Sequence, residues 1–352
     1  MLNNRTLISK IDLEKMQDIL YDFPGQCAQA VRNSENLQIP DEFLKNLKTI
    51  VVCGQGGSAI GGEILQTLLE KTSSIPVLLN RKYTLPHLAD ERTLILLVSY
   101  SGNTEETISA YQEARKRDCL LWCVSSGGEL SKLSKNDGVP WTKIPGGMPP
   151  RTCLGYLFIP LVRIGEKIGL IKEQNYRELE DKLRDLRKTC SLAVATENNP
   201  AKSLARQLKG KIPLIYGIET VTGVVAHRWK TQFNENSKMF AFWDVLPELD
   251  HNEVVPWGER NKFDPKLFHV IIIGEKDGDP KINKRIQVTS SLIERRGNEV
   301  TQIWAEGENL LSKILSTIYL GDWVSFYLAI LNQVDPTPVA GIDLLKRELA
   351  KL

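Results

Sequence analysis

The chain has 352 residues, 42% of them hydrophobic and 25% charged, which is the composition of an ordinary globular protein. Its 45 basic and 43 acidic side chains nearly cancel, so the strongly basic surface of a nucleic-acid-binding domain is not expected. We find no apolar run near the roughly 20 residues of a membrane span and no signal-peptide pattern. The sequence therefore predicts a soluble, cytoplasmic protein of about two domains, with neither nucleic acid nor a membrane as partner.

Metal chemistry is not expected either. The six cysteines are scattered without a CxxC pair, and none of the four histidines completes a zinc set with them. We therefore expect reduced, buried thiols and no bound metal. The cysteines are Cys27, Cys53, Cys119, Cys123, Cys153 and Cys190.

Strands and helices alternate in the first half of the chain. An amphipathic helical stretch spans residues 12–38, and helical patterns follow at 63–71 and 101–117. Short apolar runs typical of strands lie at 49–53, 75–80, 93–98 and 120–125. This alternation predicts right-handed βαβ units and a parallel sheet covered by helices on both faces.

A second series of the same kind follows a largely helical connection. Strands are predicted at 211–218, 267–274 and 300–304, and helices at 224–238, 280–296 and 310–331. The predicted fold class is α/β, with two doubly wound subdomains joined by helices. We assign residues 1–150 to N-terminal helices plus the first subdomain, 151–200 to the connection, and 201–352 to the second subdomain and a C-terminal tail.

A glycine-rich loop, GQGGSA, follows the first predicted strand. It formally fits the dinucleotide-binding fingerprint, with Ala59 in the third small position. The fingerprint also expects an acidic residue about 20 positions on, whereas the second strand ends at Asn80 and Arg81. An arginine there can meet a 2′-phosphate, so NADP stays open. A tight turn that needs glycines is the other alternative.

A second loop, SYSGNT, favours a different ligand. Ser99, Ser101 and Thr104 bring three hydroxyls to a helix N-terminus, where free N–H groups and the helix dipole attract an anion. One hydroxyl alone would indicate only a helix cap. Three of them beside a Gly-Gly-Ser turn on the neighbouring strand predict a phosphate-binding cradle. Its predicted members from the first loop are Gly56, Gly57 and Ser58.

The two loops resemble a known family. GGSAIGG and SYSGNTEET are similar to the sugar isomerase (SIS) domain, and PGGMPPRTCLGYL, KTQFNENSK and PELDHNEVV resemble more narrowly the bifunctional phosphoglucose/phosphomannose isomerases. The resemblance runs from about Val51 to the C-terminus. It implies two SIS subdomains and an enzyme that interconverts glucose 6-phosphate, mannose 6-phosphate or both with fructose 6-phosphate, without a cofactor.

Aldose–ketose isomerisation needs a base that moves a proton between C2 and C1 through an enediolate. A carboxylate in a partly dry pocket can do this without a metal. Glu235 is the candidate base, because it lies between two amide residues, Asn234 and Asn236, and because the resemblance implies this role. An exposed helical glutamate without a catalytic role is the alternative reading, and Glu253 is the next candidate base.

A cyclic hexose phosphate must open before its C2 proton becomes acidic. Histidine suits this step because its ordinary pKa is about 6.5. His251 in LDHNE is the candidate, since His227 and His269 fall inside a predicted helix and strand and His87 has no visible partner. The resemblance implies that this histidine reaches the neighbouring subunit, and therefore a homodimer with shared active sites.

Three further residues complete the predicted site. Arg151, after PGGMPP, offers a fixed cation to the enediolate oxygens. Thr337 in DPTP and Lys346 in LLKREL look like the family's substrate-facing tail, in which the lysine assists ring opening and the small threonine admits either C2 epimer. A surface arginine and a solvated helical lysine are the alternatives.

Three rival functions stay open. They are a non-catalytic sugar-phosphate regulator, another SIS isomerase that acts on amino-sugar phosphates, and a nucleotide-dependent dehydrogenase. No helix-turn-helix module is visible before the first subdomain, which disfavours a DNA-binding regulator.

Overall fold

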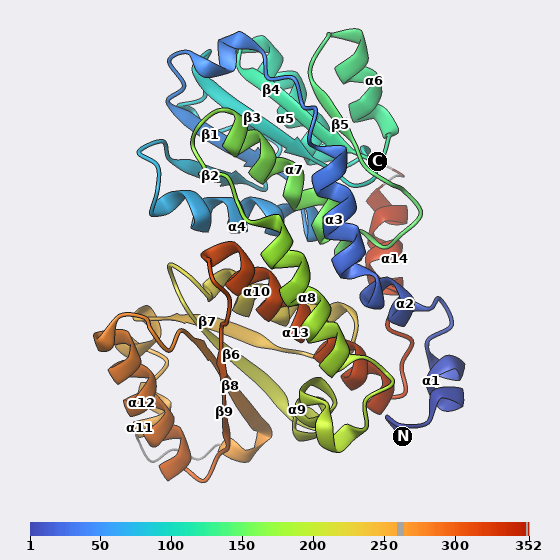
Figure 1. Cartoon of the computed structure of the whole chain (residues 1–352), viewed down its shortest axis with the longest axis vertical. Helices are drawn as coiled ribbons and strands as arrows, with labels where there is room; N and C mark the ends of the chain where they lie inside the picture. The colour runs from blue at the N-terminus through green and yellow to red at the C-terminus, as the bar shows by residue number, and fades with distance from the viewer. Residues whose placement is uncertain (259–263, 350, 352) are drawn as a thin grey trace. The chain divides into compact units, whose positions relative to one another are not determined.

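The computed structural model describes residues 1–258, 264–349 and 351. These residues fold into two compact units, one formed by Asp22–Asp181 and the other by Met1–Tyr21 together with Lys182–Leu352. Each unit is built around one parallel sheet (Figure 1). Residues 151–181 thus group with the first sheet, and residues 1–21 group with the second.

The first sheet has the strand order β2-β1-β3-β4-β5, and all neighbouring strands are parallel. Every residue of its central strand β3 is buried, as expected for a parallel strand covered on both faces. This order is that of a doubly wound fold and confirms the predicted class. The strands are β1 (Thr49–Cys53), β2 (Val77–Asn80), β3 (Thr93–Val98), β4 (Leu120–Ser125) and β5 (Trp141–Lys143).

Helices cover both faces of the first sheet (Figure 1). Helices α5 (Glu105–Lys116) and α6 (Gly128–Asn136) pack on the face that carries Val51 and Ile95. Helix α4 (Gly57–Glu70) lies on the face of Val52, where Gly62 has no Cβ to collide with that side chain. The other helical segments of this unit are α3 (Phe23–Asn33), η1 (Asp41–Leu44), η2 (Pro150–Thr152) and α7 (Leu154–Lys167), while α8 (Tyr176–Cys190) passes into the second unit.

The second sheet repeats the topology of the first. Its order is β7-β6-β8-β9, again with parallel neighbours, so the expected structural duplication is present in the strand order. The sequence prediction missed β7, a five-residue edge strand whose first two residues are exposed. The strands are β6 (Ile212–Ile218), β7 (Phe242–Leu246), β8 (Phe268–Gly274) and β9 (Val300–Trp304).

The helices of the second unit also lie on both faces of its sheet (Figure 1). The N-terminal helices belong here: the Tyr319 hydroxyl donates to the backbone oxygen of Leu20 over 2.7 Å. The helical segments are α1 (Arg5–Ile11), α2 (Met16–Tyr21), η3 (Thr196–Asn198), α9 (Pro200–Leu208), α10 (Gly223–Glu235), η4 (Glu248–His251), α11 (Val255–Gly258), η5 (Pro265–Leu267), α12 (Pro280–Arg295), α13 (Leu310–Leu331) and α14 (Ala340–Leu349).

Helix α13 is the central helix of this unit. By length and composition it could cross a membrane, but 94% of its most apolar window is buried inside the protein. The sequence analysis recognised no such span. Because α13 is apolar all round, it packs against α9 on one side and α10 on the other, as a core helix does. Gly321 leaves space for the Trp229 indole of α10, whose nitrogen donates to Thr317 O over 2.9 Å.

Candidate functional site

The two predicted cradle loops meet at one edge of the first sheet. They follow β1 and β3, which are neighbours in the order β2-β1-β3-β4-β5. The connections from these two strands lead to opposite faces of the sheet, so this is its topological switch point. Ligands of doubly wound sheets bind outside the carboxyl ends of the strands at that point. The topology therefore places the predicted cradle where such folds bind their ligands.

The β1 loop owes its shape to glycines. Gly56 has a φ of +50°, in the left-handed region that side chains disfavour. Gly57 begins α4 and lies against the backbone of Arg151, since a Cβ on Gly57 would be 3.0 Å from the Arg151 Cα. Arg151 is itself buried. The structure thus brings the Arg151 backbone next to the first cradle loop within one unit, although the sequence assigned Arg151 to the helical connection.

The β3 loop is held by Ser99 and Gly102. The buried Ser99 Oγ lies 2.8 Å from Thr104 Oγ1 and accepts a hydrogen bond from Gly102 N over 3.1 Å. Gly102 has a φ of +72°, and a Cβ there would lie 1.8 Å from the carbonyl oxygen of Gly127. Only glycine therefore fits at this position of the loop.

The hydroxyls of the cradle divide into two groups. Ser99 and Ser58 are buried, and Ser58 Oγ accepts from Tyr100 N over 3.3 Å, so these two connect the loops from within. Ser101 is exposed and Thr104 is half-buried. Within the described chain, no side-chain hydrogen bond caps α5 at Thr104. The N–H groups at this helix end therefore remain available to an anion, which favours the phosphate reading over capping.

Tyr100 is a structural member of the site that the sequence analysis missed. Its hydroxyl accepts a hydrogen bond from Met148 N over 2.9 Å, and its carbonyl oxygen accepts one from Ser126 Oγ over 2.7 Å. Tyr100 thereby fixes the segment that leads to Arg151 against the β3 loop. The sequence feature that could have indicated this role is a large aromatic residue between two serines, because a loop fully exposed to solvent has no packing role for such a residue.

The corresponding edge of the second sheet does not suit an anion. The loop after β8 contains Glu275, Asp277 and Asp279, and Glu219 follows β6. The Thr222 hydroxyl donates to Ile273 O and accepts from Ile218 N, so it closes its own loop. Among the described residues, the three-hydroxyl loop therefore lies in the first of the two duplicated crevices.

Arg81, the residue that could meet the 2′-phosphate of NADP, has a partner within its own unit. The Arg81 guanidinium forms an ion pair with Glu63 of α4, and its backbone oxygen accepts from Gln55 Nε2 over 2.8 Å. Arg81 therefore links α4 to the end of β2. A 2′-phosphate would have to displace Glu63 from this guanidinium.

Glu235 is the last residue of α10, in the second unit, and is half-buried. Its two amide neighbours anchor the helix end: Asn234 Nδ2 donates to Met239 O and Asn236 Nδ2 donates to Ser325 Oγ, both over 2.9 Å. The amides flanking Glu235 thus fix its backbone. Helix α10 is fixed in turn on α13, where Gln232 donates to Asp322 over 2.8 Å.

His251 ends the η4 turn of the second unit and is exposed. Glu253, the alternative base, is half-buried and accepts a hydrogen bond from the Tyr216 hydroxyl over 2.7 Å. Burial, with the nearby charge of Asp244, raises the pKa of Glu253. His227 stacks on Trp243 at 4.7 Å, and the buried His269 lies 2.8 Å from Thr301 Oγ1, so both have the structural surroundings expected of them.

The two tail residues differ in exposure. Thr337 is buried, and its backbone N–H donates to Asp335 Oδ1 over 3.0 Å. Lys346 is exposed on α14, a helix with no buried residue. Glu235, His251, Thr337 and Lys346 all belong to the second unit, whereas the cradle and Arg151 belong to the first.

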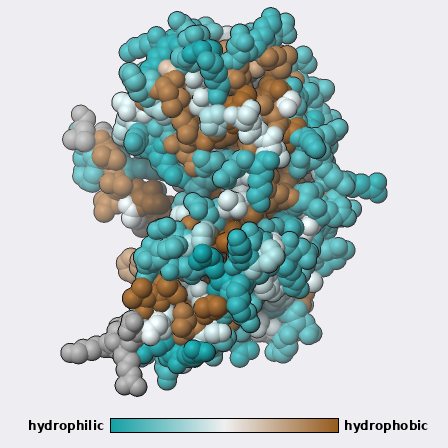
Figure 2. All heavy atoms as spheres, turned by 90° about the vertical axis from the view of Figure 1, so that its left-hand side faces the viewer, coloured by the Kyte–Doolittle hydropathy of each residue, from teal (hydrophilic) through white to brown (hydrophobic). Residues whose placement is uncertain are grey.

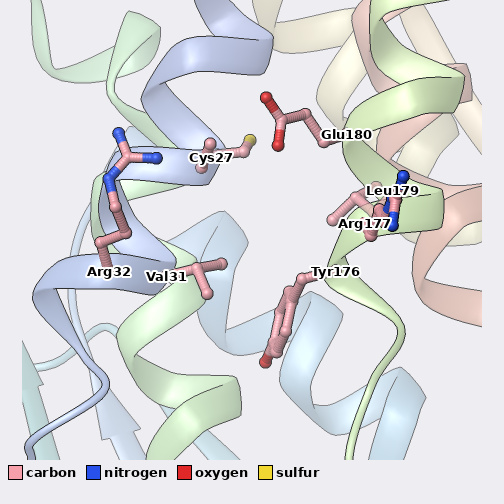
Figure 3. A pocket seen from close by; sticks show the side chains of 8 residues that line it. Cys27, Val31, Arg32, Tyr176, Arg177, Leu179 and Glu180 are labelled. Carbon is pink, nitrogen blue, oxygen red and sulfur yellow. The ribbon is translucent and has the colours of Figure 1, made fainter.

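A small cavity of the first unit has different chemistry. It measures about 200 Å³ and lies between α3 and α8, with Cys27 and Val31 on one side and Tyr176 and Leu179 on the other (Figure 3). Burial raises the pKa of the Cys27 thiol, which keeps it protonated and unreactive. The cavity is smaller than the roughly 300–1,000 Å³ of ordinary ligand pockets. It carries no hydroxyl cluster comparable to the cradle.

Comparison with known proteins agrees with this geometry. Residues 43–137 match the SIS domain, and residues 197–349 match the bacterial phospho-glucose isomerase C-terminal SIS domain. A bifunctional phosphoglucose/phosphomannose isomerase of Caldicellulosiruptor bescii is 40% identical over 96% of this chain and 99% of its own. One from Aquifex aeolicus is 36% identical over 86% of this chain and 91% of its own. The chain belongs to the bifunctional phosphoglucose/phosphomannose isomerase family.

A solved structure with little sequence identity shares the architecture. A hypothetical protein from Thermus thermophilus superposes with a TM-score of 0.73 at 15% identity, over 99% of this chain and 92% of its own. This likeness concerns the fold. The described residues of this family member contain no group of three or more His, Cys, Asp or Glu that could hold a metal ion. All six cysteines are buried free thiols, as expected.

Proposed function

We propose that the chain is an aldose–ketose isomerase that interconverts glucose 6-phosphate and mannose 6-phosphate with fructose 6-phosphate in the cytoplasm. The observation that carries this proposal is the pair of loops after β1 and β3, with the exposed Ser101 and the half-buried Thr104 beside an uncapped helix end, in a chain of this family. The loops take the 6-phosphate, and the chemistry occurs at C1 and C2.

The phosphate is bound by the Gly56–Ser58 turn, by Ser101 and Thr104, and by the first N–H groups of α5. Ser99 shapes the loop beneath them. Arg151 stands beside the cradle and supplies the fixed positive charge that the enediolate oxygens need. The phosphate contacts persist through the reaction, so they contribute mainly to substrate affinity.

Glu235 acts as the base. Its carboxylate takes the proton from C2 of the open-chain aldose, the electron pair moves toward the C1 carbonyl, and an enediolate results. Returning the proton to C1, while the hydroxyl proton of O2 passes to O1, gives the ketose with its carbonyl at C2. His251 moves the proton between the ring oxygen and the anomeric hydroxyl during ring opening, assisted by Lys346. The small side chain of Thr337 leaves space for either C2 epimer.

One assay tests this function directly. The purified protein is given fructose 6-phosphate without added metal or NAD(P), and glucose 6-phosphate and mannose 6-phosphate are measured separately. Formation of both supports the proposal. Binding of fructose 6-phosphate without turnover would instead assign the chain to non-catalytic regulators, and turnover of amino-sugar phosphates alone would assign it to another SIS isomerase.

The division of the cradle hydroxyls gives a matched pair of variants. Ser101→Ala should raise KM about tenfold or more with an unchanged melting temperature, because a hydrogen bond to a charged group contributes about 1.5–3 kcal/mol. Ser99→Ala should lower the free energy of unfolding by about 0.5–1.5 kcal/mol, because the Ser99 Oγ contacts with Gly102 N and Thr104 Oγ1 are lost while Gly102 N keeps its bond to Ser99 O. Steady-state kinetics and thermal unfolding of both variants check this. Equal KM changes in the two would contradict the division.

The proposal includes a homodimer with shared sites. Large apolar side chains are exposed on the second unit at and before the edge strand β7, with Phe240 78% and Phe242 51% exposed. Helix α14 also exposes Leu344 and Leu345, and brown, apolar side chains lie open at the surface in Figure 2. Apolar surface of this kind supports association with a second copy. His251 follows β7 closely in the chain and is exposed, as a residue offered to a neighbouring subunit must be.

Mixing two inactive variants tests this sharing. If His251 acts in the neighbouring subunit's site, Glu235→Gln and His251→Ala chains should restore up to about half of the sites of each heterodimer once subunits exchange. Activity is measured after exchange has been verified by mass spectrometry of differently tagged chains. Heterodimers that form without regaining activity would show that each chain carries its own complete set.

A further inference from the structure

The turn that carries His251 is short and irregular, yet it is attached at several points. It comprises η4 and the residues up to Val254, between the edge strand β7 and α11. His251 and Asn252 are exposed, while Leu249 is fully buried beneath them. A histidine on such a turn is positioned only as well as the turn itself is fixed.

The residue before His251 attaches the turn to α12. The side chain of Asp250 is only 12% exposed. Its Oδ2 accepts from Arg285 Nη1 and its Oδ1 accepts from Thr289 Oγ1, both over 3.0 Å. Arg285 and Thr289 are four residues apart, so they stand on one face of α12. Both oxygens of the carboxylate are therefore used by the same helix.

A second attachment lies two residues beyond His251. The carboxylate of Glu253 accepts from the Tyr216 hydroxyl over 2.7 Å, and Tyr216 belongs to the central strand β6. The Trp257 indole donates to the same hydroxyl over 3.3 Å. His251 thus lies between two anchored carboxylates that bind two different elements of the unit.

We infer that Asp250, held by Arg285 and Thr289, is a positioning residue for His251 in the ring-opening step. This inference rests on the proposed role of His251. Because Asp250 is directed into α12, the adjacent His251 side chain is left at the surface, where it can meet a substrate. The attachment fixes the backbone that carries the imidazole, and a displacement of about 1 Å can cost up to 100-fold in rate.

Asp250→Asn breaks this arrangement with little change in shape. Both partners donate to the carboxylate, whereas an asparagine carries one acceptor oxygen, one NH2 donor and no charge. The ion pair with Arg285 is therefore lost, and the Thr289 hydroxyl must turn round to accept. Thr289→Val removes the hydroxyl at constant volume, whereas Thr289→Ser keeps it. Glu275→Gln is the matched control, because Glu275 forms a similarly buried ion pair with Lys313 over 2.8 Å in the same unit.

The readout is the ratio of kcat/KM for glucose 6-phosphate to kcat/KM for a four-carbon aldose phosphate that cannot close a ring. We expect Asp250→Asn and Thr289→Val to lower this ratio about tenfold, and Thr289→Ser and Glu275→Gln to leave it unchanged. Melting temperatures of all four variants are measured in parallel, because a merely structural contact would lower stability without changing the ratio.

His251→Ala separates the two possible failures. If His251→Ala lowers the ratio but Asp250→Asn and Thr289→Val do not, the positioning role of Asp250 is wrong and the role of His251 stands. If His251→Ala itself leaves the ratio unchanged while the enzyme converts both substrates, the ring-opening assignment is wrong and the inference about Asp250 falls with it.

Discussion

Replacing Glu235 with glutamine is expected to lower kcat for both hexose 6-phosphates by about 10²–10⁴-fold, the usual contribution of a positioned acid–base group. KM should change little, because the cradle and Arg151 belong to a separate unit and retain their contacts. Glutamine keeps the size of the side chain at the end of α10 but cannot accept the C2 proton. Steady-state kinetics on each substrate, with the melting temperature as a check on folding, measure this effect.

Glu253→Gln provides the comparison for this prediction. Glu253 is the nearby alternative base, but its carboxylate is already an acceptor for Tyr216. We expect this variant to retain most of its kcat on a four-carbon aldose phosphate, on which Glu235→Gln is inactive. The reverse result, with Glu253→Gln inactive and Glu235→Gln active, would transfer the role of the base to Glu253.

Gly102→Ala is expected to disrupt the cradle and the first unit together. The added Cβ would lie 1.8 Å from Gly127 O, and the φ of +72° is itself unfavourable for alanine. Relieving such a contact requires movement of two backbone loops, so we expect the free energy of unfolding to fall by about 3 kcal/mol. KM should rise at least tenfold, because the β3 loop no longer presents Ser101 and Thr104 correctly.

Gly138→Ala separates the effect of the collision from that of the backbone conformation. Gly138 has a φ of +67° in the same unit, but no atom lies within 4 Å of its added Cβ. Gly138→Ala should lower the free energy of unfolding by only about 1–2 kcal/mol and leave KM unchanged. Chemical denaturation and steady-state kinetics compare the free energy of unfolding and KM of the two variants. Equal losses of stability would mean that the contact with Gly127 is not what requires glycine in the cradle.

The fold could be predicted because the strands of parallel sheets are short, apolar and regularly spaced. The runs at β1, β3, β4, β6 and β8 were recognised on this pattern. Strand β7 was not, because an edge strand with exposed Phe242 and Trp243 lacks a continuous buried run. The attachment of the N-terminal helices to the second unit depends on contacts such as Tyr319 with Leu20, which no local pattern encodes.

The site could be predicted only as a set of residue types. Ser101 is exposed and Thr104 is half-buried. The sequence could not indicate that Ser99 and Ser58 are buried instead, because all four are hydroxyls in similar loops. The amides beside Glu235 were read as chemical neighbours of the base, whereas they anchor the end of α10. Long-range hydrogen bonds of this kind follow from packing, not from spacing.

The central claim is that Glu235 carries a proton between C2 and C1 of a hexose phosphate bound at the cradle. Incubation of glucose 6-phosphate with the enzyme in D₂O, followed by NMR of the sugar, tests it most directly. We expect deuterium at C2 of the recovered glucose 6-phosphate with the native chain and neither deuterium nor ketose with Glu235→Gln. Conversion to fructose 6-phosphate without any deuterium, undiminished in Glu235→Gln, would contradict it.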